Sequence, residues 1–183
     1  MKVFVTTGCG NIIQGGADMW TNNFIELVLP HLSEYYILVD SKKPIGWKDT
    51  YNLEKRGKLH FHLEDAKKTD FILKMCSEIH FLHANYHKRD HLWKYKDKWG
   101  TIFVQAYLPD MLQYGDSLRQ FSTNVVEDDV IELLTYCKKR IWIGNNPSEI
   151  FNDFETETIT NFYEFKHNIE LGKINNKIGF ASR

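Results

Sequence analysis

Four glycines stand close together after the first hydrophobic run of the chain, and they could form a seat for a phosphate group. Residues 2–7 are rich in β-branched and aromatic side chains, which is typical of a buried strand. The glycines that follow are Gly8, Gly10, Gly15 and Gly16. From Ala17 apolar residues recur at helical spacing, and a helix that begins there points unpaired N–H groups at the space above the sheet. The pattern predicts an anion site, with a plain strand-to-helix turn as the alternative.

A single carboxylate, Asp40, ends the second predicted strand at residues 35–40. Dinucleotide-binding enzymes place a ribose-binding acid at the corresponding position. However, the glycine loop lacks the G-x-G-x-x-G spacing, because Gly8-Cys-Gly10 is followed by Asn11. A dinucleotide-dependent enzyme is therefore the disfavoured alternative.

Histidines occur at two spacings that could suit a metal ion. His60 and His62 alternate along a predicted strand at residues 59–63 and would share one face, although an edge strand with a polar face is the favoured interpretation. Three more are spaced by four, namely His83, His87 and His91. His83 is predicted to end a strand, which breaks the shared helical face, and no carboxylate or cysteine completes a ligand set. The sequence prediction therefore includes no metal and treats this run as a solvated helix face.

The elements that would position these groups alternate between strand and helix. Predicted strands cover residues 2–7, 35–40, 59–63, 77–86 with an exit loop, 101–106, 140–144 and 159–165. The first predicted helix begins at residue 17 and ends or kinks at Pro30, and the others cover residues 64–76, 86–98 and 127–139. In the second helix, Ala66, Phe71 or Ile72, and Met75 are expected to face inward. Nearly wholly apolar strands separated by helices predict an α/β fold, a Rossmann-like doubly wound parallel sheet with helices on both faces.

The carboxyl ends of such strands meet at one rim, where ligands bind. The residues expected at this rim are Gly15, Gly16, Asn85, Tyr107, Asp110 and Asn145.

Composition excludes several classes of protein. The 183 residues carry a net charge of −1, so the whole-chain charge gives no reason to expect nucleic-acid or membrane binding. Three widely spaced cysteines form neither a disulfide framework nor a zinc pattern, and they fit a reducing, cytoplasmic setting. No run of residues is long enough to span a bilayer.

The order of these segments resembles the N-terminal half of the GT-B glycosyltransferases, in particular the retaining family 4. The Gly-Gly-Ala loop of that family is matched at residues 15–17, and its D-I-V-H-x-H strand exit is similar to Glu-Ile-His-Phe-Leu-His at residues 78–83. Residues 103–110 take the place of its V-V-V-T-x-H-D segment, without the histidine, and residues 166–170 resemble its P-N-G-I-D segment.

The last residues resemble the strand that opens the second GT-B domain. Ile-Gly-Phe-Ala-Ser-Arg at residues 178–183 is similar to I-x-F-V-G-R, whose arginine contacts the donor diphosphate. The resemblance implies an N-terminal Rossmann-like domain at residues 1–172, followed by a linker and the first strand of a missing or truncated C-terminal domain at residues 173–183.

The resemblance implies transfer of a sugar from a nucleotide-sugar donor to an acceptor hydroxyl, with no cofactor beyond that co-substrate. This chain would supply the acceptor side of the enzyme and would be incomplete alone. The implied donor-binding residues are Gly15, Gly16 and Arg183, the acceptor-binding residues are Asn85, Tyr107 and Asn145, and the catalytic candidates are Asp110 and His83. Asp110 follows a proline, and a turn residue is the alternative role for it.

Two other functions stay open. One is a stand-alone Rossmann-like binding module without catalysis. The other follows from a fainter resemblance, around Val104 and Gln105, to the GT-B enzymes that glucosylate phage DNA. This resemblance implies a modified DNA base as the sugar acceptor. Only the basic run at residues 87–98 supports nucleic acid as a partner. If the missing domain leaves Ile178 and Phe180 uncovered, a homodimer through that surface is expected.

Overall fold

Seven parallel strands form one sheet, which confirms the predicted α/β Rossmann-like fold. The computed structural model describes residues 1–10, 16–82, 90–105, 127–143 and 154–159. Within them the strand order is β3-β2-β1-β4-β5-β6-β7, and every neighbouring pair is parallel. The strands are β1 (Lys2–Thr6), β2 (Tyr35–Val39), β3 (Leu59–Phe61), β4 (Glu78–Phe81), β5 (Trp99–Gln105), β6 (Lys139–Ile143) and β7 (Thr156–Ile159).

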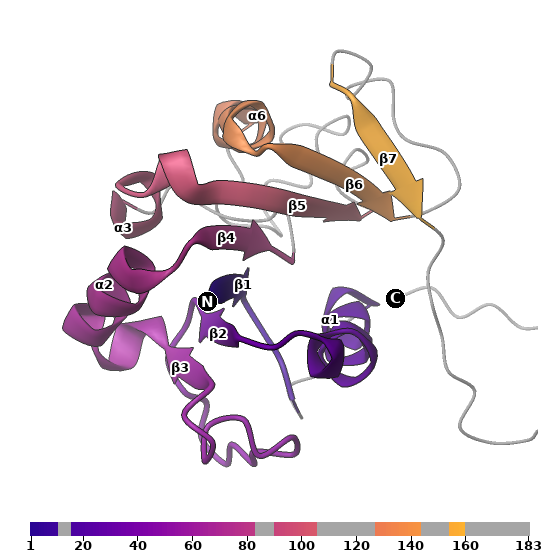
Figure 1. Ribbon diagram of the computed structural model, residues 1–183. Coiled ribbons are helices and arrows are strands. Elements are labelled where there is room, and N and C mark those ends of the chain that lie inside the picture. The colour runs from indigo at the N-terminus through magenta and orange to yellow at the C-terminus, as the bar shows by residue number, and fades with distance from the viewer. Residues whose placement is uncertain (11–15, 83–89, 106–126, 144–153, 160–183) are drawn as a thin grey trace, which may run out of the picture.

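Helices cover both faces of the sheet, because each parallel connection must cross over one face (Figure 1). The α-helices are α1 (Gly16–Leu27), α2 (Ala66–Met75), α3 (Asp90–Trp93) and α6 (Glu127–Tyr136), and the 3-10 helices are η1 (Leu29–His31), η2 (His62–Glu64) and η3 (Lys96–Lys98). Helices α2, α3 and α6 lie on one side of the sheet, and α1 lies on the other.

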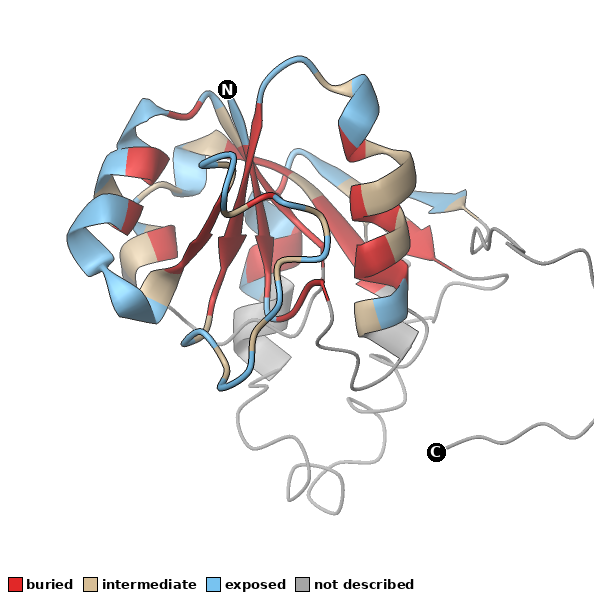
Figure 2. Ribbon diagram, turned by 90° about the horizontal axis from the view of Figure 1, so that it is seen from below, coloured by how far each residue is buried: buried red, intermediate tan, exposed pale blue. Residues whose placement is uncertain are grey.

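Two apolar cores result, one on each face of the sheet. The core under α2, α3 and α6 contains the fully buried rings of Trp99 and Trp142. The core under α1 is built from Trp20, Phe24 and Phe103, whose ring centroids lie 5.1–5.3 Å apart. Figure 2 shows the buried strands between the partly exposed helices. Among the described residues, no helix combines the length and apolar character that crossing a membrane requires.

Several predicted details differ from the structure. The third strand ends at Phe61 rather than residue 63, because β2, the strand it pairs with in the described sheet, ends at Val39. His62 therefore begins a 3-10 turn instead of continuing the strand, although the rings of His60 and His62 both contact Oγ1 of Thr69. The predicted helix at residues 86–98 is, in its described part, the short α3 and η3. Strand β7 (Thr156–Ile159) begins three residues before the last predicted strand, and residues 160–165 of that prediction lie outside the described residues.

The inward face of α2 was predicted only in part. Ile72 is buried as expected, but Ala66 is exposed, and Phe71 and Met75 are 63% and 61% exposed. The buried stripe instead follows Thr69, Ile72, Leu73 and Cys76, which repeats at i, i+3, i+4 and i+7. The helical spacing of apolar residues predicted the helix correctly. It did not determine which of two adjacent rows of side chains faces the sheet.

Two positively charged side chains, Lys98 and Arg140, donate hydrogen bonds to the carbonyl groups at the C-terminal ends of α2 and α6. Nζ of Lys98 donates to the carbonyl oxygens of Leu73, Lys74 and Cys76 at 2.7–3.0 Å, which satisfies the end of α2. Arg140 does the same for α6, since its guanidinium donates to three carbonyls between residues 134 and 137. Unpaired carbonyls and the negative end of the helix dipole both favour a cation at this position.

A bulge between β4 and β5 is filled by the ring of His80. The register moves by one residue between the pairs Ile79–Trp99 and Phe81–Ile102. The N–H of Thr101 donates to Nδ1 of His80 at 3.0 Å, and the ring stacks on Phe4 with centroids 5.0 Å apart. Gly100 makes room for it, because an added Cβ would lie 2.8 Å from Cε1 of His80.

His80 should make stability depend on pH. Burial, with a smaller contribution from Lys2, lowers the pKa of His80 from 6.5 to about 4, so the unfolded chain binds a proton there that the folded chain does not. The free energy of unfolding should therefore fall as the pH drops from 6.5 to 4, by an amount on the order of 3 kcal/mol. Urea unfolding across this range measures it.

The matched variant is His80→Asn, whose side-chain oxygen can still accept the N–H of Thr101 but cannot titrate. Because burial also lowers the pKa of His62, the comparison between the two proteins isolates His80. Equal pH slopes in wild type and His80→Asn would rule out this role.

Candidate functional site

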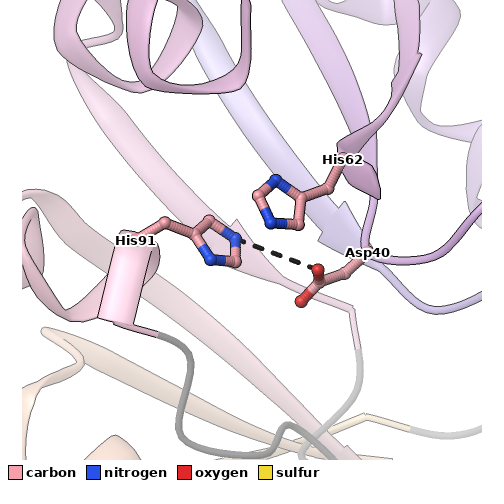
Figure 3. A group of neighbouring side chains, drawn as sticks. All are labelled: Asp40, His62 and His91. Atoms are coloured by element: carbon pink, nitrogen blue, oxygen red, sulfur yellow. Dashed lines mark ion pairs between the residues drawn. The ribbon is translucent and has the colours of Figure 1, made fainter. Parts of the chain in front are cut away.

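Three side chains from separate elements meet at the carboxyl edge of the sheet (Figure 3). Asp40 follows the last residue of β2, and His62 follows the last residue of β3. His91 lies in α3, on the chain that returns after β4. Because β2 and β3 are parallel neighbours, their ends bring Asp40 and His62 to the same edge, and α3 brings His91 beside them.

The three side chains are close enough to act on a single small ligand. One nitrogen of each histidine and one carboxylate oxygen all lie within 4.8 Å of one another. Nε2 of His91 is 3.8 Å from Oδ1 of Asp40, and the ring of His62 stacks on that of His91 with centroids 3.7 Å apart and planes 11° from parallel. The Asp40 side chain has 0% exposure, whereas His91 keeps 21%, so the cluster is open to solvent on the histidine side.

A hydroxyl behind the cluster sets the tautomer of His62. Oγ1 of Thr69 lies 3.2 Å from the carbonyl oxygen of Asp65 and 3.1 Å from Nδ1 of His62. The Thr69 hydroxyl donates to this carbonyl, and we assign the tautomer in which Nδ1–H of His62 donates to Oγ1 of Thr69. His60 completes the group, with Nε2 3.0 Å from the same carbonyl and 3.1 Å from Oγ1 of Thr69. This arrangement leaves the lone pair of His62 on Nε2.

The surroundings of His62 favour its neutral form. Burial, and then the neighbouring His60, lower the pKa of His62. A neutral imidazole can accept a proton or bind a metal through its lone pair. The buried carboxylate of Asp40 beside two imidazoles can therefore serve either a cation or a proton-transfer step.

The described part of the glycine loop is closed by an aromatic side chain. Gly10 has a φ of +68°, and an added Cβ would lie 2.6 Å from Cη2 of Trp47. The indole N–H of Trp47 donates to Glu54 at 3.0 Å, which holds the ring in place. Glycine at this position is thus explained by packing and backbone conformation, with no phosphate required.

Two carboxylates, those of Asp18 and Asp49, lie near enough to this loop to act on Cys9. The pKa of Cys9 is raised to about 12, first by burial and then by the carboxylates of Asp49 and Asp18. Asp18 lies in the first turn of α1, where it already uses the positive end of the helix dipole. The described loop residues are therefore a poor seat for a phosphate by themselves.

Most of the predicted site residues lie outside the part of the chain that the structure describes, namely His83, Asn85, Tyr107, Asp110, Asn145, Gly15 and Arg183. The predicted segment at residues 173–183 lies outside it as well. Gly16 is described and is the first residue of α1, as the predicted strand-loop-helix order requires.

The sequence prediction missed the meeting of Asp40, His62 and His91, although it considered each of them. Asp40 was weighed as a ribose ligand, but its carboxylate is buried beside Nε2 of His91, which removes support from the dinucleotide alternative. His62 was paired with His60, and His91 with His83 and His87. A partial signal existed, because Asp40 is the last residue of one predicted parallel strand and His62 lies one residue from the end of the next.

Comparison with protein-family models, with curated proteins and with solved structures finds no match for this chain.

The contact between Gly10 and Trp47 gives a matched pair of glycine variants. Gly10→Ala should cost about 1–2 kcal/mol for the left-handed backbone and about 1–3 kcal/mol more for the clash with the indole. Gly57→Ala should cost only the first amount, since Gly57 has the same φ of +68° and nothing within 4 Å of an added Cβ. Chemical denaturation of the two variants checks the difference, and equal losses would contradict this packing.

Proposed function

We propose that this chain is the acceptor-side domain of a nucleotide-sugar-dependent glycosyltransferase of the GT-B type. One observation carries the proposal beyond the resemblance in sequence. Strands β1, β2 and β3 extend the sheet in one direction, and β4 returns to the opposite side of β1, so the strand order reverses between β1 and β4. Ligands of open α/β sheets bind outside the carboxyl ends of the strands at such a reversal.

The proposed site residues follow, in sequence, the strands nearest to that reversal. His83 and Asn85 come after β4, which ends at Phe81, and Tyr107 comes two residues after the end of β5. Gly15 and Gly16 come after β1 and lead into α1. This order supports an acceptor site over the middle of the sheet.

The chemistry of such a site would be mainly orientation and charge stabilisation. The acceptor oxygen would bond to the anomeric carbon of the sugar as the bond from that carbon to the phosphate breaks, and the nucleoside diphosphate would leave. The charge that develops on this leaving group would be stabilised by backbone N–H groups and by a cation. Gly15 and Gly16 would offer N–H groups, and Arg183 would offer a bidentate guanidinium. Asp110 would contact the acceptor hydroxyl, with His83 as a second polar group and Asn145 at the rim of the acceptor site.

The carboxylates of Asp18 and Asp49 near Cys9 are compatible with a donor site shared between two domains. The acceptor-side half would bind the dianionic donor weakly by itself, because Asp18 and Asp49 oppose a phosphate near the described loop. Donor binding would then depend on groups contributed by a second domain, together with Arg183.

The described lysines of the basic run do not favour DNA as the acceptor. Lys94 pairs with Asp70 at 2.8 Å, and Lys98 donates to the carbonyls that end α2. Lys96 lies 4.4 Å from the ring centroid of Tyr136. All three charges are engaged within the chain, so we favour a small or carbohydrate acceptor over a modified base.

Calorimetric titration with UDP-, GDP- and ADP-sugars tests the proposal. The product of the complete reading frame that contains this chain should bind one of them saturably, and residues 1–183 alone should bind it much more weakly. Arg183→Ala should weaken binding, because it removes the diphosphate contact, whereas the exposed control Arg56→Ala should not.

If the longer protein binds none of the nucleotide-sugars, the stand-alone binding module becomes the better explanation. If it binds one equally well with Arg183→Ala, the assignment of Arg183 is wrong while the proposed activity stands.

A further inference from the structure

We propose that Asp40, His62 and His91 form a binding site for one divalent transition-metal ion, for which Zn²⁺ is the probe. The proposal goes beyond the glycosyltransferase assignment, which requires no metal. It rests on three ligand atoms that lie within 4.8 Å of one another at the carboxyl edge of the sheet.

The donor set suits such an ion. Zn²⁺ is bound in proteins by imidazole nitrogen and carboxylate oxygen, and open sites use three protein ligands with a fourth position for water or substrate. Two histidines and one carboxylate also accommodate Fe²⁺, Co²⁺ and Ni²⁺. The carboxylate of Asp40 is buried against Nε2 of His91, so it supplies a negative charge that solvent screens little.

Thr69 prepares His62 as a ligand. Metal-binding histidines almost always donate their second N–H to a fixed oxygen, which sets the tautomer and the ring orientation. Nδ1–H of His62 donates to Oγ1 of Thr69 at 3.1 Å, and the hydroxyl is itself held by the carbonyl oxygen of Asp65. Nε2 of His62 is therefore the atom that would bind the ion.

Metal binding requires one ring of the stacked pair to turn. The two imidazoles lie 3.7 Å apart and nearly parallel, whereas each must point its in-plane lone pair at a shared ion. Ligand atoms around tetrahedral Zn²⁺ are separated by about 3.4 Å, so the atoms must also draw together. We expect His91 to move, because it belongs to the four-residue helix α3 while His62 is tied to Thr69.

The thiols of the described residues compete poorly for zinc. Cys9, Cys76 and Cys137 are all buried thiols. A metal that binds the folded chain tightly should therefore reveal itself through the histidines.

The first experiment titrates the purified chain with Zn²⁺ by calorimetry and with Co²⁺ by visible absorption. One ion per chain is expected. His62→Gln, His91→Gln and Asp40→Asn should each weaken binding by more than about 100-fold, because each removes a direct ligand. His31→Gln, which changes an exposed histidine on η1, should leave it unchanged.

Circular dichroism must show that each variant is folded before its affinity is compared. Absence of stoichiometric binding by the folded chain would overturn the proposal. So would binding that both histidine variants retain, since the ion would then occupy another site.

A second experiment tests the positioning role of Thr69 and the turning of the ring. Thr69→Val should lower Zn²⁺ affinity by about 10–100-fold, and Thr69→Ser, which keeps the hydroxyl, should restore it. In the metal-free chain, NMR should show imidazole protons of His62 and His91 shielded by the stacked neighbour, and Zn²⁺ should abolish that shielding. Persistent shielding in the Zn²⁺-saturated chain would contradict the proposed site.

These outcomes are independent of the glycosyltransferase proposal, because every readout is made without a nucleotide-sugar. Failure of zinc binding leaves the donor titration unaffected, and failure of the donor titration leaves the zinc result unaffected.

Discussion

The common direction of the seven strands is the constraint on which the rest of the structure depends. Parallel strands can be joined only by crossovers, so helices cover each face of the sheet, and inner strands such as β1 and β2 must be apolar on both sides. The same constraint brings the carboxyl ends of all the strands to one edge. Asp40 and His62 follow neighbouring strand ends, and their proximity is therefore a consequence of topology rather than of local sequence.

The sequence predicted the fold class because the signal for it is strong. Strands β1 and β2 are short runs of β-branched or aromatic residues that are buried on both faces. Such runs, alternating with helical patterns, are typical of a parallel sheet covered by helices. The details that failed depend on neighbours rather than on residue type. The end of β3 is decided by the length of β2, and the inward stripe of α2 by the sheet beneath it.

The sequence pointed to the individual residues of the candidate site but not to their meeting in space. Local rules applied to the sequence place Asp40 as a strand-end acid, His62 in a strand pair with His60, and His91 in a helical repeat. Those rules compare residues within one element, whereas the site combines two strand ends and a short helix. Thr69 gave no signal in sequence, since its role depends on facing both His60 and His62 from α2.

The central claim is that side chains carried to the carboxyl edge by β2, β3 and α3 act together on one ligand. Anomalous X-ray diffraction from crystals grown with Zn²⁺ tests it most directly. A single strong peak between Asp40, His62 and His91, with the two rings no longer parallel, is the predicted result. A peak at other residues, or none at these three with the rings still stacked, would contradict the claim.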